Sequence, residues 1–434
     1  MSAARADVAL LPRLLSGLGG PGMADLDRHL ALHGEIRGPR ELDAERLIDL
    51  VEQAGLRGRG GAGFPSATKM RAVRAARGNP IVVANGCESE PVSQKDELLL
   101  TELPHLVLDG AALAARAVGA DQVIISYESP RSATRAGLET AIAQRRAARA
   151  DTVRFELFAA AERFLTGQET SLVSQINGGL PRPSFIPPRP TTRGVRRRPT
   201  LIHNVETLAH LALIARHGPD WYRELGTAAE SGSTLVTVAG AVGVPGVYEI
   251  ECGTPLRDLF AAAGGLGPVA GLLIGGYFGS WLPASAAVEI ELSNEALAAH
   301  DATLGCGAVV ALPASACPVA ETVRVAVFLA TETAQQCGPC VNGTASIARA
   351  LHGIAEGRPP RGAFADLARW TGAVTGRGAC HLPDGLAHFV ATALATFARQ
   401  FEHHAAHGPC DACAAEPVLE FPAPAAAPGR GRRW

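Results

Sequence analysis

The segment from Arg57 to Lys69, RGRGGAGFPSATK, constrains the fold of this chain more than any other. Four of the six residues from Gly58 to Gly63 are glycine. A packed helix or strand does not accommodate so many, because glycine loses backbone entropy on folding and has no side chain to bury. Such runs occur where backbone amides approach a ligand closely, typically a phosphate at the N-terminus of the next helix. Ser66 is the expected start of that helix.

The loop does not match the common nucleotide-binding patterns. No Gly-Lys-Ser/Thr follows at P-loop spacing, and the dinucleotide fingerprint requires a strand directly before the glycines. The preceding residues 45–51, ERLIDLV, have helical spacing instead. The loop is therefore expected to join two helices and to bind the phosphate of a different cofactor. The alternative is a tight surface loop without a ligand.

Composition excludes several classes of function. At 434 residues the chain is long enough for two to four domains. A net charge of −2 gives no indication of nucleic-acid binding. The longest uncharged run, 259–288, is interrupted by glycine and proline and falls short of the roughly 20 apolar residues of a membrane helix. The N-terminus has no signal-peptide pattern. We expect a cytoplasmic protein without a transmembrane segment, which reaches the inner face of the cell membrane only through a partner.

Strands and helices alternate after the glycine loop, which predicts an α/β domain. The expected strands are 80–84, 122–127 and 152–158, and the expected helices are 106–118 and 131–149. The first strand ends in NGCESEP at 85–91, and active groups collect at such carboxyl ends.

Two further motifs follow in the chain. GQET at 167–170 opens a helix, and HNVET at 203–207 opens another, with Asn204 as its cap. The proline- and arginine-rich loop 178–200 between them predicts a binding loop or a disordered one.

The second half is expected to contain a β-rich domain with a hairpin at 234–250 and then a helical bundle with helices at 347–356, 363–370 and 385–401. The expected boundaries are a lead-in at 1–43, an α/β domain at 44–228, the β-rich domain at 229–318, a helical domain at 319–406, and a CxxC with a disordered tail at 407–434.

Nine scattered cysteines, an odd number, argue against a disulfide framework and for thiols or metal ligands. A CxxC before a helix is a redox dithiol, a zinc half-site or a pair of iron–sulfur ligands. The thioredoxin-type dithiol requires a βαβ context that is absent here. Buried unreactive thiols account for Cys252, Cys306 and Cys317. The candidate ligands are Cys337, Cys340, Cys380, Cys410 and Cys413.

These motifs together resemble those of the NADH-binding flavoprotein subunit of respiratory complex I and its relatives in NAD-linked hydrogenases and formate dehydrogenases. The resemblance covers about 48–401. It implies an FMN-binding α/β domain, followed by a β-grasp (ubiquitin-like, SLBB) domain and a C-terminal iron–sulfur helical bundle.

The resemblance implies that FMN lies along the glycine loop, with NGCESEP, GQET and HNVET around the flavin and nicotinamide. Glu90 and Glu169 are the implied catalytic residues, as acceptors for nicotinamide or ribose donors. The implied cofactor-binding residues are Gly58, Arg59, Gly60, Gly61, Ala62, Gly63, Lys69, Asn85, Glu88, Glu90, Gly167, Gln168, Glu169, Arg189, His203 and Asn204.

The chain departs from the family at the cluster. Relatives carry CxxCxxC before the bundle, but Ala334 stands at the first position. Cys337, Cys340 and Cys380 match the remaining ligands of a 4Fe-4S cluster. We expect Cys410 to supply the missing thiolate; the alternative is a lost or labile cluster.

The nicotinamide side departs as well, because relatives have Lys-Pro-Pro and an aromatic residue where this chain has Ile186-Pro187-Pro188-Arg189. An arginine stacks on adenine or binds a 2′-phosphate, so NADH and NADPH both remain candidates. The implied function is an FMN-dependent oxidoreductase subunit that passes electrons to a ferredoxin-like iron–sulfur carrier or a membrane oxidoreductase subunit. The alternatives are a ferredoxin-linked flavoprotein that does not use nicotinamide and a docking subunit without catalysis.

Overall fold

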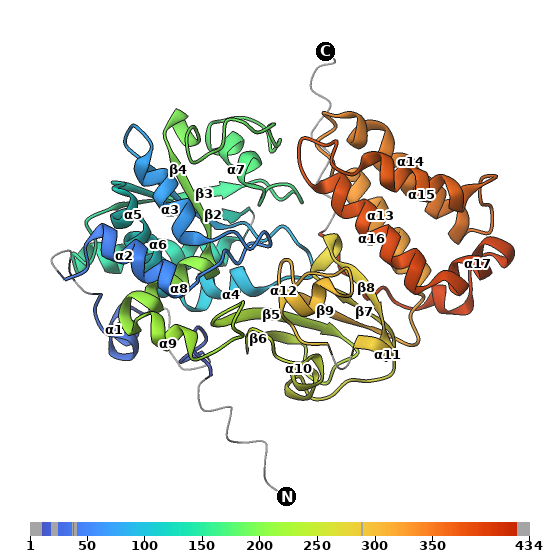
Figure 1. The fold of residues 1–434 in the computed structure, drawn as a ribbon, viewed down its shortest axis with the longest axis horizontal. Helices are drawn as coiled ribbons and strands as arrows, with labels where there is room; N and C mark the ends of the chain where they lie inside the picture. Colours follow the sequence, from blue (N-terminus) through green and yellow to red (C-terminus); the bar gives the residue numbers. More distant parts are fainter. Residues whose placement is uncertain are drawn as a thin grey trace, which may run out of the picture.

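The computed structural model describes residues 11–18, 25–36, 38, 41–129, 131–287 and 290–422. These residues form an α/β domain, a smaller mixed β domain and a helical bundle, which follow one another along the chain (Figure 1). The expected fold class is confirmed.

The α/β domain is built on a parallel four-stranded sheet of order β3-β2-β1-β4, with helices on both faces. Its strands are β1 Ile81–Gly86, β2 Gln122–Glu128, β3 Arg154–Ala160 and β4 Thr200–Asn204. Its helices are α1 Leu26–His33, α2 Ala44–Gln53, α3 Ser66–Ala75, α4 Lys95–Glu102, α5 Pro104–Val118, α6 Ser132–Ala147, α7 Glu169–Ile176, α8 Val205–His217 and α9 Pro219–Arg223, with a short 3₁₀ turn at Val195–Arg197. Strands buried on both faces explain the β-branched runs of β1 and β2.

Two of the elements that were not expected from the sequence lie next to the motifs. Helix α4 directly follows the NGCESEP segment, and strand β4 lies at the end of the long loop, where it pairs with β1. Strand β4 brings Asn204 beside Asn85, in register at the carboxyl end of the sheet. The close packing of α5 on α8 requires glycine at Gly110, because a Cβ there would lie 1.8 Å from the carbonyl oxygen of Leu208.

The second domain is a five-stranded mixed sheet of order β6-β5-β9-β7-β8. The expected hairpin is confirmed as the antiparallel pair β5–β6. Its elements are β5 Ser233–Gly240, β6 Gly246–Glu251, α10 Leu256–Ala262, β7 Val269–Ile274, a 3₁₀ turn at Gly276–Phe278, β8 Ser280–Pro283, α11 Ala284–Ala287, α12 Asn294–Ala298 and β9 Ala308–Pro313.

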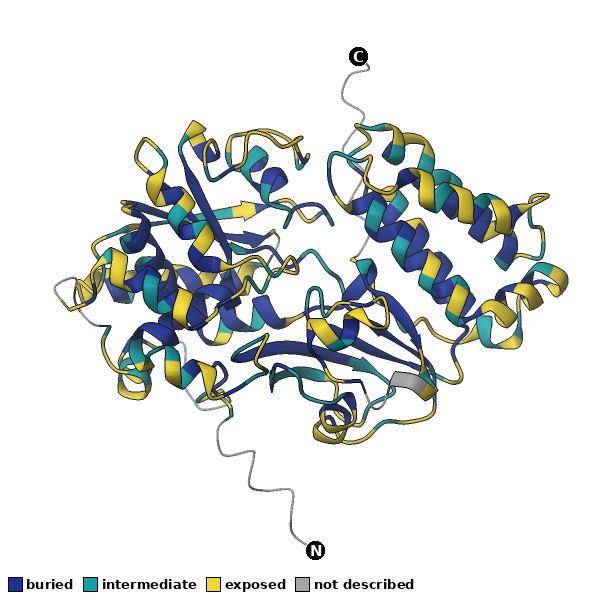
Figure 2. Cartoon of the chain, viewed as in Figure 1, coloured by how far each residue is buried: buried dark blue, intermediate teal, exposed yellow. Residues whose placement is uncertain are grey.

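The third part is a helical bundle that shares a hydrophobic core with the second domain, and Figure 2 shows the buried faces of its helices turned inward. Trp281 of β8 packs against Phe389 and Phe397 of the bundle. The elements are α13 Pro318–Thr331, a π-helical turn at Pro339–Thr344, α14 Ala345–Ala355, α15 Ala363–Val374, α16 Leu382–Thr396, α17 Ala398–His407 and a 3₁₀ turn at Asp411–Ala414. The helix expected at 385–401 is two helices, because the backbone leaves helical geometry at Phe397.

The first part of the tail beyond Ala415 is ordered, whereas the sequence predicted a disordered tail. Residues 416–422 follow a defined path on the bundle, with Leu419 only 1% exposed, so this part is not disordered. The carboxylate of Glu321 explains the path, because it accepts hydrogen bonds from the backbone amides of Val418 and Leu419. Residues 423–434 lie outside the described residues.

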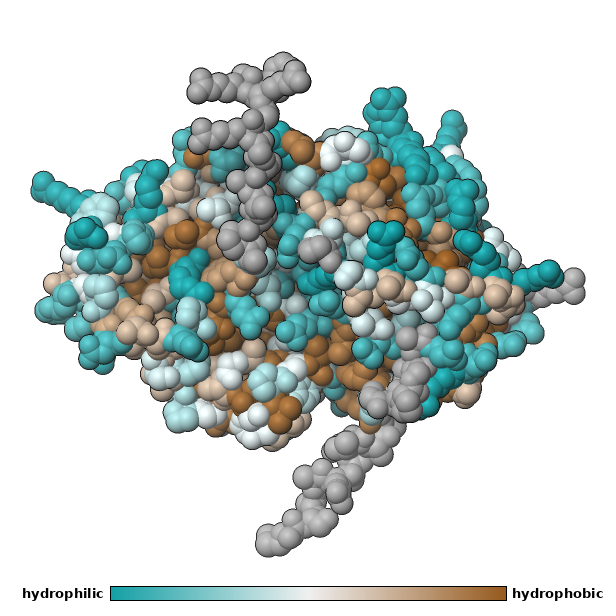
Figure 3. Space-filling view, turned by 180° about the vertical axis from the view of Figure 1, so that it is seen from behind, coloured by the Kyte–Doolittle hydropathy of each residue, from teal (hydrophilic) through white to brown (hydrophobic). Residues whose placement is uncertain are grey.

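On the back of the molecule, hydrophilic and apolar side chains are mixed over the whole face (Figure 3). Within the part of the chain that the structure describes, no single helix is long and apolar enough to cross a membrane; only α4 and α5 taken together, with a 96° bend between them, pass that test.

Candidate functional site

The glycine loop joins α2 to α3, as expected, and is closed at its base by backbone hydrogen bonds. The amide of Gly58 donates to the carbonyl of Phe64 (2.9 Å), and that of Ser66 to Leu56 (3.0 Å). Gly61 (φ +101°) and Gly63 (φ +59°) have left-handed backbones that favour glycine. The glycines therefore shape a loop whose amides are not used up by a helix or a sheet.

The loop rests on the N-terminus of α8. A Cβ at Gly60 would lie 3.3 Å from Cβ of Asn204, and the amide of Arg59 donates to Oγ1 of Thr207 (2.9 Å). Asn204 caps α8 as expected, by accepting from the amide of Glu206. Two helix N-termini, those of α3 and α8, thus lie beside the loop, and both favour an anion.

Lys69, one turn into α3, binds the GQET segment and strand β4. Its Nζ pairs with the carboxylate of Glu169 at the start of α7 and donates to the carbonyl of Ile202 on β4 (2.7 Å). His203 lies next along β4, and its buried Nε2 has no hydrogen-bond partner among the described residues. Burial, together with the charge of Lys69, lowers the pKa of His203 to about 3, so this imidazole is neutral.

The GQET segment is held against the end of β1. The side-chain amide of Asn85 donates to the carbonyl of Gly167 (2.8 Å), and the amide of Gly167 donates to Oγ of Ser89 (3.0 Å). Gln168 caps α7 by accepting from the amide of Ser171 (2.8 Å). The sequence-predicted residues of the two motifs are thus brought together at the carboxyl edge of the sheet.

The two glutamates of NGCESEP have different surroundings. Glu88 is engaged within the protein, because its carboxylate accepts from Oγ of Ser93 and from the amides of Asp96 and Glu97, which fastens the start of α4. Its oxygens are occupied by these bonds, which favours a supporting role over the expected contact with a cofactor.

Glu90 reaches the second domain. Its Oε2 accepts from the amide of Tyr277 (3.0 Å), whereas its buried Oε1 has no hydrogen-bond partner among the described residues. Burial raises the pKa of Glu90 to about 8. Gly276 permits this approach, because a Cβ there would lie 2.6 Å from Oε2 of Glu90 and 2.7 Å from Sγ of Cys306. No local pattern in the sequence indicated Tyr277 as a neighbour of this site.

Lys95 is the centre of a buried ionic network below the loop. Its Nζ pairs with Asp96 (2.7 Å) and Glu206 (2.9 Å), and Asp96 also accepts from the amide group of Asn204 (2.6 Å). Burial alone would raise the pKa of Glu206, but Lys95, with His210 and Arg59, holds it well below the usual range. The network fixes the cap residue of α8 at the edge of the site.

Arg59 points away from the loop, into the boundary with the second domain. Its side chain is 10% exposed and donates to the hydroxyl of Tyr222 and the carbonyl of Ser233 (3.1 Å each). Sγ of Cys252 lies 3.5 Å away. In this arrangement the guanidinium joins two domains, and only the backbone of Arg59 remains with the loop.

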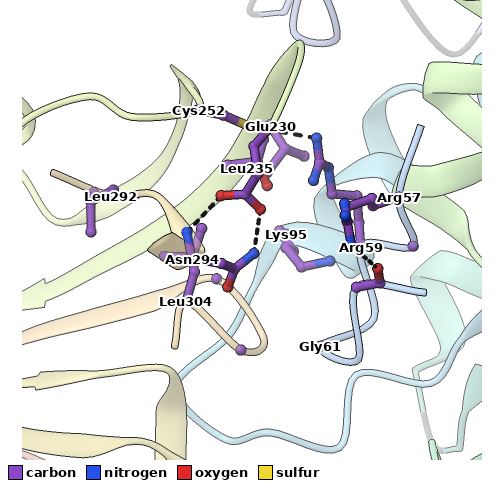
Figure 4. A pocket seen from close by; sticks show the side chains of 15 residues that line it. Arg57, Arg59, Gly61, Lys95, Glu230, Leu235, Cys252, Leu292, Asn294 and Leu304 are labelled. Atoms are coloured by element: carbon purple, nitrogen blue, oxygen red, sulfur yellow. Dashed lines mark hydrogen bonds between the residues drawn. The ribbon is translucent and has the colours of Figure 1, made fainter. Parts of the chain in front are cut away.

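A hollow separates the glycine loop from the second domain (Figure 4). Arg57, Gly61 and Lys95 line one side of it, and Leu235 and Asn294 line the other. The loop thus borders open space on the side of the second domain.

The residues at the carboxyl edge fit an FMN group. Free loop amides, two helix N-termini and Lys69 suit a phosphate dianion, and the partnerless polar atoms of His203 and Glu90 suit a polar ring system. Ala62 lies in the same loop. Arg189, by contrast, lies on the exposed long loop, where Phe185 is 64% exposed.

Three cysteines gather beside the segment that precedes GQET. Sγ of Cys337 lies 3.5 Å from Sγ of Cys340, and Cys380 is close enough to interact with both thiols electrostatically. Ala334 packs into the same apolar cluster as Cys380. The three thiols therefore fit three ligand positions of a 4Fe-4S cluster. The fourth ligand position, at Ala334, is apolar.

The expectation that Cys410 completes this set is wrong. Cys410 lies with Cys317, His404 and Cys413, all four ligand atoms being within 4.8 Å of one another. His404 contacts the carbonyl of Ala355, at the C-terminal end of α14.

The cysteine pair lies at the other end of that helix. Cys340 is in the turn that leads into α14, whose eleven residues span about 16 Å at 1.5 Å per residue. Cys317, expected to be an unreactive thiol, is likewise placed in the second group.

Comparison with known proteins agrees with this architecture. Residues 51–213 match the family described as the Nuo51 FMN-binding domain, residues 235–272 the SLBB domain, and residues 320–404 the NADH-ubiquinone oxidoreductase-F iron-sulfur binding region.

Relatives match over most of their length. An NADH-quinone oxidoreductase subunit of Streptomyces coelicolor is 30% identical over 398 residues, covering 87% of this chain and 86% of the relative. The NADP-reducing hydrogenase subunit HndC of Solidesulfovibrio fructosivorans is 28% identical, covering 91% and 84%. A crystal structure of an NAD⁺-reducing [NiFe]-hydrogenase in the H₂-reduced state superposes with a TM-score of 0.82 at 33% identity, over 92% of this chain and 68% of that one. The chain belongs to the family of NADH dehydrogenase-type flavoproteins of NADH-quinone oxidoreductase, which combine an FMN-binding domain, an SLBB domain and an iron–sulfur region.

Proposed function

We propose that this chain oxidises NAD(P)H at FMN and delivers the electrons to an iron–sulfur cluster at Cys337, Cys340 and Cys380. The observation that carries the proposal is the position of segment 164–169. Its first residues pack with Cys380 and its last residue pairs with Lys69 of the flavin site. Six residues span at most about 21 Å when extended, so the two sites are close.

Phe164 occupies the cluster end of this segment. Its ring packs on Phe278 at 4.9 Å and on Phe328 at 5.7 Å, so it is fixed by the second domain and by the bundle together. The segment is anchored in the middle by Asn85, which bonds Gly167. A connection held at both ends and in the middle keeps the separation of the two sites constant, which electron transfer between them requires.

At the flavin site, Lys69 and the amides of residues 60–63 would hold the phosphate of FMN, and Asn85 and Asn204 would lie beside the flavin. When bound, FMN accepts a hydride and releases electrons singly. The protein contributes binding and electrostatics. Glu90 and Glu169 offer carboxylates to nicotinamide or ribose donors, and a protonated Glu90 donates a hydrogen bond instead.

The exposed loop 178–194 is the proposed nucleotide-binding side. Arg189 is a planar cation that stacks on adenine or binds a 2′-phosphate, and Ile186 beside it is 48% exposed. The carbonyl of Pro183 accepts from the side chain of Gln336, directly before the cysteine pair. This contact joins the proposed nucleotide-binding loop to the segment that carries Cys337 and Cys340.

The proposed acceptor is a partner iron–sulfur protein or a membrane oxidoreductase subunit, since the chain belongs to a family of flavoprotein subunits. The three-cysteine site leaves one iron of a cubane without a cysteine ligand. We expect such a cluster to be more labile than one with four thiolates.

Anaerobic titration of the purified protein tests the proposal. NADH or NADPH should bleach the flavin absorbance stoichiometrically, and the more effective nucleotide identifies the substrate. If bound flavin is bleached by reduced ferredoxin but by neither nucleotide, the ferredoxin-linked alternative holds. If no flavin copurifies and none can be restored, the docking alternative holds.

A further inference from the structure

A second group of metal-ligating side chains lies outside the flavin and cluster sites. Cys317 precedes α13, and His404 is in the last turn of α17. Cys410 precedes the 3₁₀ turn Asp411–Ala414, and Cys413 lies within it. Their ligand atoms all lie within 4.8 Å of one another. Three segments thus converge at one point of the bundle, and none of these residues takes part in the proposed electron transfer.

The distances within the group fit one tetrahedral ion. Zinc–sulfur bonds of about 2.3 Å and zinc–nitrogen bonds of about 2.0 Å at tetrahedral angles place two sulfurs about 3.8 Å apart and a sulfur and a nitrogen about 3.5 Å apart. The observed separations are 3.8 Å between the thiols of Cys410 and Cys413, 3.4 Å from Cys317 to Nε2 of His404, and 3.9 Å from Cys413 to the same nitrogen.

The surroundings prepare the ligands. Nδ1 of His404 lies 3.0 Å from the carbonyl oxygen of Ala355, which only accepts, so Nδ1 carries the proton and Nε2 presents its lone pair to the thiols. The amide of Ala320, in the first turn of α13, donates to Sγ of Cys317 (3.4 Å), which orients this sulfur.

Other arrangements fit these atoms less well. The 3.8 Å between Cys410 and Cys413 is far beyond the roughly 2.05 Å of a disulfide. The iron–sulfur cluster is already assigned to Cys337, Cys340 and Cys380, at the other end of α14. Three thiolates and one imidazole, all in protein, form a closed set that is typical of structural zinc.

We propose that Cys317, His404, Cys410 and Cys413 bind a zinc ion, which fastens segment 410–422 to the bundle. Beyond the two cysteines, further contacts hold this segment. Glu321 accepts the amides of Val418 and Leu419, the hydroxyl of Tyr277 donates to the carbonyl of Glu420, and Phe421 packs on Tyr277 at 5.5 Å.

The segment reaches the flavin site through Tyr277, because the amide of the same residue donates to Glu90. By holding segment 410–422 in place, the zinc ion would therefore support Tyr277, the residue that positions Glu90. Its role is structural: it joins α13, α17 and the C-terminal segment, and it exchanges no electrons.

Metal analysis of the full-length purified protein tests the site separately from iron. We expect about one zinc per chain in the wild type. Cys413→Ala should lose the zinc and keep the iron, whereas Cys337→Ala should lose iron and keep the zinc. His404→Cys replaces one ligand type by another and should retain zinc, which guards against a variant that merely misfolds.

Proteolysis tests the fastening. Because Pro417 follows Glu416 and protects that bond, a glutamate-specific protease cleaves this segment after Glu420. We expect cleavage there to be about tenfold faster in Cys413→Ala than in wild type or His404→Cys. Absence of zinc from the wild type, zinc retained in Cys413→Ala, or iron lost from that variant in place of zinc would overturn the zinc site. Equal cleavage of all three proteins would overturn the fastening role.

Discussion

Lys69 and Glu169, 100 residues apart in the chain, form an ion pair that joins the helix of the glycine loop to the N-terminus of α7. The carbonyl of Ile202 on β4 accepts from the same ammonium group. One cation therefore connects the helix of the glycine loop, the GQET segment and strand β4 around the proposed flavin phosphate.

Replacing Lys69 with glutamine should weaken FMN binding. Removing a charged hydrogen-bond donor costs about 1.5–3 kcal/mol, which corresponds to a loss of affinity on the order of 10- to 100-fold. Fluorescence titration of flavin-free protein with FMN measures the effect.

The control for this change is Arg71→Gln, on the same helix. Arg71 pairs with Asp49 and Glu52 at the surface, away from the loop. We expect its FMN affinity to equal that of the wild type. Equal affinities for the Lys69 variant and the wild type would remove Lys69 from the site.

Ala334→Cys should restore the missing thiolate, because Ala334 packs in one cluster with Cys380. We expect the iron content to rise toward about four per chain and the cluster to survive longer in air. Iron analysis and the decay of visible absorbance measure this.

Ala368→Cys, at an exposed position on α15, is the matched control and should leave both the iron content and the lifetime of the cluster in air unchanged. If Ala334→Cys behaves like this control, the cluster position assigned to residue 334 is incorrect.

Glu90 should make stability depend on pH. Burial raises its pKa from 4.5 to about 8 in the folded protein. The stability contributed by the protonated carboxyl is therefore fully present below the unfolded value of about 4.5 and is lost as the pH rises through about 8.

In flavin-free protein, we expect the unfolding temperature of wild type to fall between pH 4.5 and about pH 8. That of Glu90→Gln should fall less steeply, because the glutamine side chain stays neutral. Parallel pH profiles of the two proteins, measured by differential scanning fluorimetry, would refute the buried, protonated state of Glu90.

Arg59 should matter for stability more than for flavin binding. Its guanidinium is buried between domains and bonded to Tyr222 and Ser233. Removing one partner of a buried charged group costs about 3 kcal/mol, so Arg59→Gln should lower the free energy of unfolding by about that amount.

Arg57→Gln in the same loop removes an exposed guanidinium and should change that free energy by less than about 0.5 kcal/mol. Urea unfolding of both variants measures the difference. A loss of FMN affinity in Arg59→Gln without a loss of stability would assign the side chain to the cofactor instead.

The local parts of the fold were predictable from the sequence, and the distant contacts were not. The glycine loop between two helices follows from residue spacing within a few turns, as does the Asn204 cap. Strand β4 has five residues, and Asn204 meets Asn85 across 119 positions, so only the folded sheet reveals that pairing.

The same distinction explains the error at Cys410. A CxxC is visible as a local pattern, but its partner is set by the path of α14, which carries the Cys337 pair and Ala355 to opposite ends of the bundle. Cys317 and His404 meet across 87 positions and offer no pattern in the sequence. The short spacing from His404 to Cys410 and Cys413 was the one local signal of this second site.

In the proposed function, electrons from NAD(P)H pass through FMN to the cluster at Cys337, Cys340 and Cys380. Electron paramagnetic resonance of the flavin-loaded protein, frozen after anaerobic addition of NADH or NADPH, tests it most directly. We expect a reduced-cluster signal that depends on both nucleotide and flavin and that disappears in Cys340→Ala. A cluster that dithionite reduces but neither nucleotide reduces, in protein with bound FMN, would contradict the account.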